Sequence, residues 1–260
     1  MSKIHVITTE EDLSIGLLEK AIRENHEFKL SYFGEQEHEI DDDDVLYLRD
    51  PFNTGRPLEE VRTTIEKIFQ KLSASKNIKV IDNLEKTEDI FFEDKWRQYQ
   101  VFRDYMPKTT IYDQEEGEPI NGSELIKERI SSRSKGIYFS SEKLPHSESG
   151  YIIQDKLDIQ TEYRVMIVAG NVLPLAGIKR SKAEYNKLAV TDATEVSSEL
   201  KQFTMVLTKL AEESGINYEM IGLDIAKTTS GSLYLIEYNR SPQFNAYTKL
   251  TQTNPAKLLF

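Results

Sequence analysis

Oxygen-bearing side chains near the C-terminus have the types and spacing of a metal site. The segment YLIEYNRSPQF, residues 234–244, places Glu237 and Asn239 two apart at the end of a strand-like run. Successive side chains of a strand point to opposite faces, so these two share one face while Ile236 and Tyr238 share the other. Taken alone, the segment also fits a solvent-facing edge strand that carries polar residues.

A second carboxylate is expected opposite the first. The run MIGLDIAKTTSGSLYLIEYN reads as a hairpin whose most economical loop is Ser230 and Gly231, and pairing about this loop sets Asp224 directly opposite Glu237. Facing carboxylates repel each other, and a divalent cation between them would relieve that repulsion. Asp, Glu and Asn oxygens are the hard ligands that suit Mg²⁺, which often shares its other positions with substrate phosphates. A hairpin in another register would leave the carboxylates merely exposed.

An upstream hairpin supplies a positive charge. The run EYRVMIVAGNVLPLAGIKR has two strand-like halves about Gly170 and Asn171, and pairing about this loop sets Glu162 opposite Lys179. Glu162 and Arg164 then share a polar face. The apolar face holds Tyr163, Val165, Ile167, Ala176 and Ile178. An ion pair between Arg164 and Glu162 would be a purely structural use of the same residues.

The elements that must position these residues alternate between strand and helix in the first ninety residues. KIHVITT, FKLSYF, VLYLRD and IKVIDN have strand patterns, whereas LSIGLLEKAIREN and LEEVRTTIEKIFQKL have helical spacing. This order predicts a small parallel α/β domain of Rossmann-like character. Neither GxGxxG nor GxxxxGK(S/T) occurs, so the usual phosphate loops are absent from the sequence. A helix at DKWRQYQVFRDY follows, then short strands and, from about residue 160, hairpins.

Composition excludes several classes of protein. The chain has 260 residues, a net charge of −11 and no cysteine. It therefore has no disulfide, zinc–thiolate site or thiol nucleophile, and an acidic chain is not expected to bind nucleic acid. We expect no membrane association, because no run of 18 apolar residues and no signal peptide occurs. The sequence predicts a cytoplasmic protein, and its four histidines form no catalytic motif.

The segment GLDIAKTTSGSLYLIEYNRSP resembles the metal-binding end of the ATP-grasp superfamily, in particular ligases similar to ribosomal-protein glutamate ligase and prokaryotic glutathione synthetase. The order of the upstream segments is similar over nearly the whole chain. The resemblance implies an α/β fold, with an N-terminal Rossmann-like pre-ATP-grasp domain over residues 1–92. It further implies a central ATP-grasp subdomain over residues 93–150 and a C-terminal subdomain with the Mg²⁺ site over residues 151–260.

The resemblance also implies roles for individual residues. The expected nucleotide contacts are Lys95 and Lys127 at the phosphates, the hinge residues Gln154, Asp155, Lys156 and Leu157 at the adenine, Glu162 at the ribose, and Asn186 on the phosphate side. Arg164 and Arg180 are expected near the transferred phosphate. Asp224, Glu237 and Asn239 are expected to bind Mg²⁺, with Mn²⁺ as an alternative ion. The loop SSRSKG, residues 131–136, is expected to cover the phosphates.

Three departures from the family pattern concern this expected site. The loop SSRSKG contains only Gly136 where relatives have more glycine, and Asp155 stands where Glu is more usual. Gln243 follows Pro242 where relatives often have Gly, so the family pattern does not predict the acceptor-side wall of the pocket. The sequence ends at Phe260 inside what reads as the start of a terminal helix, so we expect a short or trimmed C-terminus.

The implied activity is ATP-dependent ligation of a carboxylate to an amine. ATP would phosphorylate the carboxylate, the amine would attack the acyl phosphate, and ADP and phosphate would leave. Arg49, after the strand VLYL, is a candidate to hold a substrate carboxylate, and its pairing with a nearby Asp is an equal alternative. Amino acids, peptides, a protein C-terminus and ribosomally made peptides all remain open as substrates, as does a homo-oligomer. An ATP-grasp kinase and a nucleotide-binding scaffold are the alternative functions.

Overall fold

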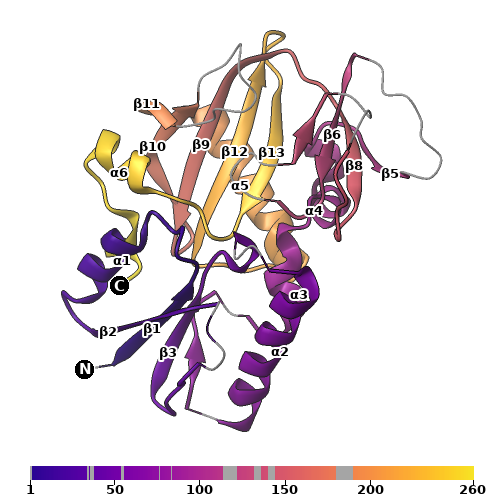
Figure 1. Cartoon of the computed structure of the whole chain (residues 1–260). Coiled ribbons are helices and arrows are strands. Elements are labelled where there is room, and N and C mark those ends of the chain that lie inside the picture. Colours follow the sequence, from indigo (N-terminus) through magenta and orange to yellow (C-terminus); the bar gives the residue numbers. More distant parts are fainter. Residues whose placement is uncertain are drawn as a thin grey trace.

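A computed structural model of the chain describes residues 2–260, except residues 34, 36, 37, 54, 55, 76, 83, 114–121, 132–135, 140–143 and 180–189. Its strands form three sheets, and Figure 1 shows the N-terminal sheet below the largest one and the smallest sheet beside it. No helix in these described ranges is long and apolar enough to cross a membrane.

The N-terminal ninety residues form a parallel sheet with a helix on each face. The strand order is β2–β1–β3–β4, with β1 at Lys3–Thr8, β2 at Glu27–Tyr32, β3 at Asp44–Leu48 and β4 at Lys79–Val80. Helix α1 (Ile15–Ile22) packs with Ile4 and Val6 on one face, and α2 (Leu58–Ala74) packs with Ile7 on the other. The predicted order of strands and helices is confirmed in this region.

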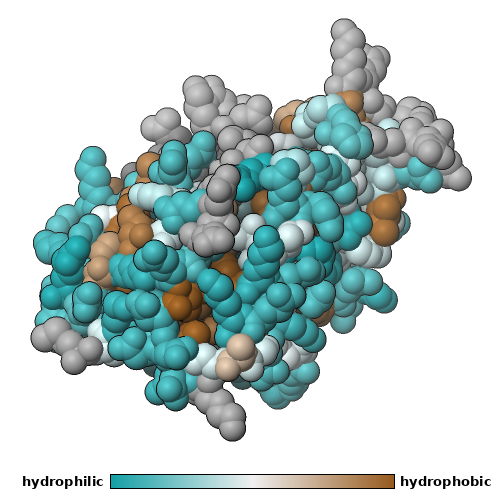
Figure 2. All heavy atoms as spheres, turned by 60° about the horizontal axis from the view of Figure 1, so that its bottom comes forward, coloured by the Kyte–Doolittle hydropathy of each residue, from teal (hydrophilic) through white to brown (hydrophobic). Residues whose placement is uncertain are grey.

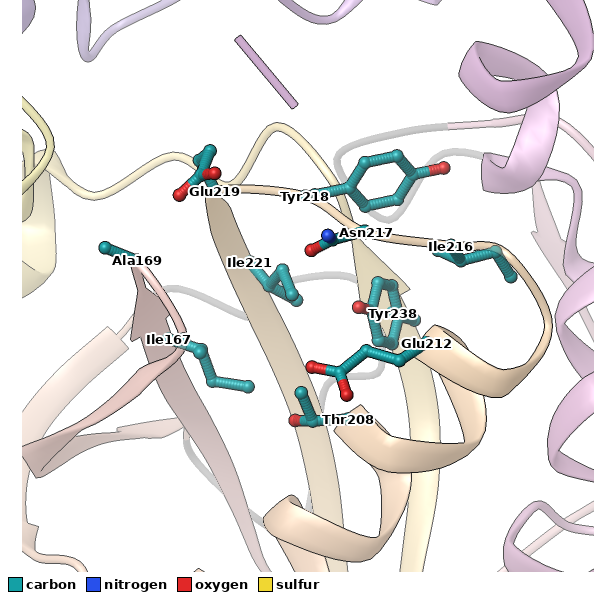
Figure 3. A pocket seen from close by; sticks show the side chains of 11 residues that line it. Ile167, Ala169, Thr208, Glu212, Ile216, Asn217, Tyr218, Glu219, Ile221 and Tyr238 are labelled. Atoms are coloured by element: carbon teal, nitrogen blue, oxygen red, sulfur yellow. The ribbon is translucent and has the colours of Figure 1, made fainter. Parts of the chain in front are cut away.

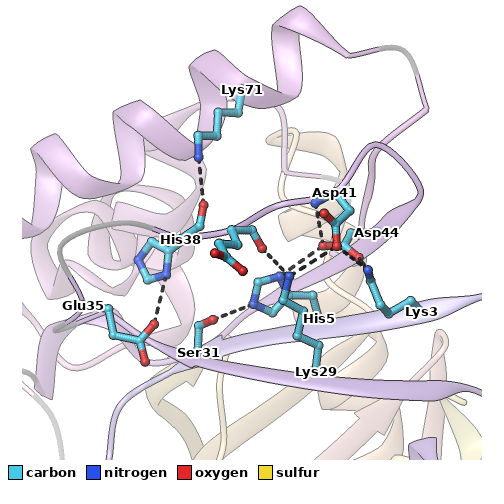
Figure 4. A network of polar contacts seen from close by, with 10 residues as sticks. Lys3, His5, Lys29, Ser31, Glu35, His38, Asp41, Asp44 and Lys71 are labelled. Atoms are coloured by element: carbon cyan, nitrogen blue, oxygen red, sulfur yellow. Dashed lines mark hydrogen bonds and ion pairs between the residues drawn. The ribbon is translucent and has the colours of Figure 1, made fainter.

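A polar network lies inside this sheet, on the face that α2 covers (Figure 4). His5 Nε2 lies 2.8 Å from Ser31 Oγ, and His5 Nδ1 lies 3.3 Å from Asp44 Oδ2. This is the order of groups in a serine-hydrolase triad. All three side chains are nevertheless buried, and burial lowers the pKa of His5. We assign the network a structural role, in agreement with the interpretation of the histidines from sequence.

The largest sheet is antiparallel, in the order β11–β10–β9–β12–β13. Its strands are β9 (Ile159–Val168), β10 (Asn171–Lys179), β11 (Val190–Glu195), β12 (Met220–Thr228) and β13 (Leu233–Asn239). Helix α5 (Ser198–Glu213) covers one face through Leu200, Leu207 and Ala211. The other face packs partly against α6 (Asn245–Thr251) and the 3₁₀ helix η4 (Pro255–Leu258). The sequence analysis did not predict α5, although Ser197 is a typical N-cap that accepts a hydrogen bond from the Leu200 N–H.

The smallest sheet is antiparallel, in the order β5–β8–β6–β7. Its strands are β5 (Thr109–Tyr112), β6 (Glu124–Glu128), β7 (Ile137–Tyr138) and β8 (Tyr151–Asp155). Helix α3 (Thr87–Ile90) and the 3₁₀ helix η2 (Phe91–Glu93) lead into α4 (Lys95–Phe102). Helix α4 contacts β13 on one side and β5 on the other, so it connects the two antiparallel sheets.

The surface at the end of the molecule that carries the N-terminal sheet is mainly hydrophilic (Figure 2). Small hydrophobic areas lie between charged side chains in this view. Such scattered apolar surface is normal for a folded chain and does not mark a binding site by itself.

Candidate active site

Arg164, Asp224 and Glu237 form a row across three neighbouring strands. The sheet register pairs Arg164 of β9 with Asp224 of β12, and Asp224 in turn with Glu237 of β13. The predicted opposition of the two carboxylates is therefore confirmed. Their side chains share the sheet face that lies opposite α5, because the buried Leu223 and Val165 next to them point toward that helix.

The loop of the β12–β13 hairpin differs from the prediction. Lys227 pairs with Leu233, and the Thr228 N–H bonds the Ser232 carbonyl, so the loop has three residues and Gly231 has a φ of 89°. A β-bulge between Asp224 and Ile225 then shifts the register back. The bulge also changes the apolar face, since Leu235 is buried beside Tyr238 while Ile236 is only half-buried.

The β9–β10 hairpin repeats this pattern. Its loop is Ala169 and Gly170, with φ values of 47° and 73°, rather than the predicted Gly170 and Asn171. Positive φ at both positions is the type I′ geometry that suits the twist of a hairpin. A bulge between Val172 and Ala176 restores the predicted register, so Glu162 does lie opposite Lys179.

The charge of Asp224 is balanced by Arg164 and not only by a prospective cation. The Arg164 guanidinium donates two hydrogen bonds to the Asp224 carboxylate, one of them from Nη2 at 2.8 Å and the other from Nε. Burial alone would lower the pKa of Arg164, but Asp224, Glu237 and Glu162 raise it. Arg164 thus offsets the expected repulsion between the carboxylates of Asp224 and Glu237. Its hydrogen bonds go to Asp224, whereas the sequence analysis had considered an ion pair with Glu162.

Lys95 lies at the edge of this row. Its Nζ is 3.9 Å from Glu237 Oε1 and donates to the carbonyl and hydroxyl of Ser131, each at 3.0 Å. Lys95 is only 8% exposed, so its charge is held in the site rather than in solvent. Ser131 is the first residue of the loop SSRSKG, whose residues 132–135 lie outside the described residues.

Two neighbours that the sequence analysis did not single out fix the position of Lys95. Asp94 caps α4 by accepting from the Trp96 N–H and also pairs with Arg129 at the end of β6. Gln98 bonds both backbone groups of Tyr238 on β13, accepting from its N–H at 2.9 Å and donating to its carbonyl at 3.0 Å. A signal for these two residues was present in the sequence. Asp94 directly precedes the helix that begins at Lys95, where an N-cap is expected, and Gln98 lies one turn later on the same helix.

Lys127 and the predicted hinge meet on the smallest sheet. Lys127 Nζ donates to Gln154 Oε1 at 2.6 Å, and both side chains are buried. The N–H groups of Asp155 and Lys156 bond the carbonyls of Lys108 and Ser123. The Leu157 N–H bonds no group among the described residues, so it is a hinge donor that remains open to a ligand.

The donor set of the proposed metal ligands fits a hard cation. Asp224 and Glu237 supply carboxylates, and Asn239 pairs with Gly222 near the end of the same strand pair. The buried Asn239 Nδ2 has no hydrogen-bond partner among the residues that the structure describes. No group of three or more carboxylates, histidines or cysteines that could hold a metal ion by itself occurs in the described ranges, so an ion here would need further ligands from phosphate and water.

Gly222 allows the chain after β13 to pack closely on this site. A Cβ at Gly222 would lie 2.7 Å from Pro242 Cβ and 3.2 Å from Arg164 Cδ. Both contacts are shorter than ordinary carbon–carbon contacts, so any larger residue would displace Pro242 or Arg164. Gly222 and Pro242, which belong to the GLD and RSP segments of the sequence, are therefore in close packing contact.

The structure corrects the substrate role considered for Arg49. Its side chain is fully buried, and its Nε pairs with Asp12 Oδ2 at 2.9 Å. Its two other nitrogens donate to Tyr47 Oη and to the Pro242 carbonyl, at 3.1 and 3.0 Å. Arg49 therefore forms the ion pair with a nearby Asp that the sequence analysis gave as the alternative to a substrate role. Because the guanidinium is fully buried, a substrate cannot reach it.

A second buried arginine, Arg240, joins the end of β13 to the N-terminal sheet. It donates to the Leu48 carbonyl and lies 3.4 Å from Asp82 Oδ2. Burial raises the pKa of Asp82 to about 6, against the opposing effect of Arg240. Burial likewise raises the pKa of Glu93 to about 7, although Arg240 and Lys95 act to lower it. The sequence analysis missed this cluster, although Arg240 directly follows the predicted metal ligands.

Glu93 is expected to make stability fall with rising pH. The pKa of its carboxyl is 4.5 when unperturbed and about 7 in the fold, so the folded protein holds a proton that the unfolded chain has lost between these values. Stability from this group is present below pH 4.5 and lost as pH rises to 7, by at most about 1.4 kcal/mol per pH unit.

Urea unfolding of Glu93→Gln and wild type between pH 4.5 and 7.5 measures this effect. Burial lowers the pKa of His5 and His38, which gives the opposite slope below pH 6.5, so the difference between the two proteins isolates Glu93. We expect Glu93→Gln to gain stability relative to wild type as pH rises. A constant difference across the range would show that the carboxyl titrates normally.

Arg180 and Asn186, which the resemblance places near the phosphates, lie outside the described residues. The described site therefore consists of two groups of predicted residues. Arg164, Asp224, Glu237 and Lys95 are brought together at the β13 edge of the largest sheet. Lys127, Gln154, Asp155, Lys156 and Leu157 lie on or directly after strands of the smallest sheet.

Comparison with known proteins rests on structure alone. No known family model and no curated protein matches the sequence. The fold is similar to that of the ATP-grasp ligase PsnB complexed with a minimal precursor, with a TM-score of 0.65 and 16% identity over 99% of this chain and 97% of that chain. It is similar to D-cycloserine synthetase DcsG, with a TM-score of 0.76 and 13% identity over 98% of this chain and 97% of that chain.

A third similar structure is the macrocyclase MdnB from Microcystis aeruginosa MRC. The TM-score is 0.64 at 13% identity, and the match covers 99% of this chain and 97% of that chain. The three similarities each extend over nearly the full length of both chains. At such low identity they establish the fold that the resemblance in the sequence implies.

Proposed function

Because the chain has the ATP-grasp fold, we propose that it is an ADP-forming ligase that joins a carboxylate to an amine. We interpret residues 1–92 as a Rossmann-like pre-ATP-grasp domain, residues 93–150 as the central subdomain and residues 151–260 as the C-terminal subdomain. This division agrees with the parallel sheet of the first part and the two antiparallel sheets of the others.

The observation that carries the proposal is the meeting of opposite charges at one sheet edge. Arg164, Asp224 and Glu237 cross three strands in a row, and Lys95 approaches the last of them at 3.9 Å. Phosphoryl transfer depends mainly on positioned cations and electrostatic stabilisation rather than on a protein nucleophile. A chain without cysteine, with its His5 and Ser31 buried, is suited to such a reaction.

The nucleotide would lie between the two antiparallel sheets. In this proposal the hinge residues 154–157 bind the adenine, and the open Leu157 N–H is a donor for its edge. Glu162, which is 5% exposed, would accept from the ribose. Lys127 and Lys95 would contact the phosphates from their two sheets.

Asp224, Glu237 and Asn239 would hold Mg²⁺ or Mn²⁺, and the solved PsnB complex with a minimal precursor contains Mg and ADP. Such an ion polarises phosphate oxygens and offsets their developing charge when it is bound. Asp224 would share its carboxylate between the ion and Arg164. Arg164 thereby stays beside the transferred phosphate, as the resemblance implies also for Arg180.

The reaction would proceed through an acyl phosphate. The substrate carboxylate attacks the γ-phosphorus of ATP and releases ADP, and the amine then attacks the activated carbonyl and releases phosphate. Charge accumulates first on the transferred phosphoryl group and then on the carbonyl oxygen. Arg164 and Lys95 are the described cations nearest to this charge, and their burial makes their stabilisation of it stronger than in water.

Lys127→Met is expected to weaken ATP binding about 10- to 100-fold, the scale of one lost charge-assisted hydrogen bond to phosphate. Adenosine binding should change little, because adenosine lacks the phosphates. Titration calorimetry with both ligands measures the difference. Equal losses for ATP and adenosine would instead indicate that Lys127 only supports the hinge through Gln154.

A screen for ADP release over amino acids and short peptides, with Mg²⁺ and ATP, tests the function. Peptides belong in the screen because PsnB was solved with a precursor and MdnB is a macrocyclase. We expect ADP to form only when a carboxylate and an amine are both offered, and the product mass to be their sum minus water. A product that gains the mass of a phosphoryl group would identify a kinase, and nucleotide binding without any turnover would identify a scaffold.

A further inference from the structure

A cavity of about 240 Å³ lies beneath the largest sheet, on the face opposite the candidate active site (Figure 3). It is lined by the tip of the β9–β10 hairpin, the start of β12 and the second half of α5, and it opens to solvent on one side. Ile167, Ile221 and Tyr238 line it, and each points away from the face that carries Arg164, Asp224 and Glu237. The cavity is therefore separate from the proposed nucleotide site.

The Tyr238 hydroxyl is an unsatisfied polar group in this cavity. Tyr238 is 1% exposed, and its buried Oη has no hydrogen-bond partner among the described residues. Figure 3 shows the oxygen directed into the cavity, toward the Glu212 carboxylate and the Asn217 amide. The oxygen of a tyrosine hydroxyl can accept a hydrogen bond as well as donate one. Leaving a buried hydroxyl unpaired costs folding free energy, which a bound ligand would recover.

The charged side chains that line the cavity favour a positively charged ligand. The carboxylate of Glu212, whose side chain is exposed at the rim of the cavity, forms no ion pair or hydrogen bond with any residue that the structure describes. No lysine, arginine or histidine is among the lining residues. The next residue on the helix, Glu213, instead pairs with Lys209 at 3.6 Å. An anion would be repelled here, whereas a cation would find an uncompensated carboxylate.

The shape and the wall of the cavity select the kind of cation. Its volume is that of about eight liquid waters at roughly 30 Å³ each. Ile167, Ile216 and Ile221 give it an apolar side, which does not suit a hydrated metal ion. A short alkyl chain that ends in an ammonium group matches both the apolar side and the polar side.

We propose that this cavity binds a small primary amine in its ammonium form. The ammonium donates to the Glu212 carboxylate and to the Tyr238 hydroxyl oxygen, and the alkyl chain lies against Ile167, Ile216 and Ile221. The site does not depend on the proposed ligase activity, since it shares no lining residue with the candidate active site.

Titration of the full chain with n-butylammonium, followed by calorimetry and by the melting temperature, tests the proposal. We expect one binding site and a rise in melting temperature. Butyrate and n-butanol should bind at least ten-fold more weakly, because the first is repelled and the second lacks the charge. Absence of butylammonium binding, or equal binding of n-butanol, would overturn the proposal.

Four variants locate the binding. Glu212→Gln should weaken butylammonium binding at least ten-fold, whereas its neighbour Glu213→Gln should not change it. Tyr238→Phe should weaken it several-fold and, without ligand, melt no lower than wild type, since an unpaired hydroxyl is removed. Glu237→Gln should leave binding intact, which separates this cavity from an amine site near the nucleotide. Loss of binding in Glu237→Gln, or full binding in Glu212→Gln, would place the amine elsewhere and refute the proposal.

Discussion

Replacing Glu237 with Gln is expected to abolish Mg²⁺-dependent ADP formation, by at least about 100-fold, while the protein remains folded. The amide keeps the shape of the side chain but loses the charge that would hold the cation. Two effects on stability oppose each other. The variant relieves the repulsion by Asp224, and it loses the attraction of Lys95 at 3.9 Å. The melting temperature should therefore change little.

Asp224→Asn is the informative partner of this variant. It should lose the same activity but also lower the free energy of unfolding by about 3–5 kcal/mol, because Arg164, whose side chain is only 13% exposed, loses the carboxylate that accepts two of its hydrogen bonds. Glu199→Gln, an exposed carboxylate that pairs with Lys227 on β12, serves as the control and should retain both properties. ADP release and urea unfolding measure the two effects. Substantial Mg²⁺-dependent activity in Glu237→Gln would refute the assignment of the metal site.

Arg49→Met is expected to destabilise the protein by about 3–5 kcal/mol, through the loss of a buried ion pair. Methionine fills much of the space but leaves Asp12 charged and buried, and it leaves the Pro242 carbonyl without its donor. The Asp12 pKa is held low by Arg49 against the effect of burial, so the carboxylate would then lose its main stabilising partner.

The double variant Asp12→Asn with Arg49→Met separates charge from packing. Removing both charges should restore part of the lost stability, since no unpaired charge remains buried. ATP binding should persist in the double variant, because Arg49 is not a nucleotide contact. If Arg49→Met unfolds at the same urea concentration as wild type, the ion pair contributes nothing, and the reading of Arg49 as a structural residue loses its support.

The face of each site residue could be predicted because side-chain alternation depends only on the strand itself. Asp224 and Glu237 were placed opposite each other from their apolar neighbours and a hairpin signal. Both hairpin loops were nevertheless misassigned by one residue or more. In each hairpin a bulge compensates for the different loop, and no residue pattern in either sequence marks where such a bulge forms.

The partners of the charged residues could not be predicted, because they come from distant parts of the chain. Arg49 is joined to Asp12 and Pro242 only after the parallel sheet has docked against the end of β13. Arg164 had an acidic neighbour in Glu162 along its own strand, yet the structure pairs it with Asp224 across the sheet. Helix α5 was not predicted, although the Ser197 cap and the apolar spacing that follows it are both signals of a helix in the sequence.

Trapping of the activated carboxylate with hydroxylamine tests the central claim most directly. The protein is incubated with Mg²⁺, ATP, a carboxylate identified by the ADP screen and hydroxylamine in place of the amine, and the hydroxamate is measured by mass. We predict that one hydroxamate forms for each ADP released, and that Glu237→Gln forms neither. ADP release with a stable phosphorylated product that does not react with hydroxylamine would contradict the acyl-phosphate mechanism and identify the protein as a kinase.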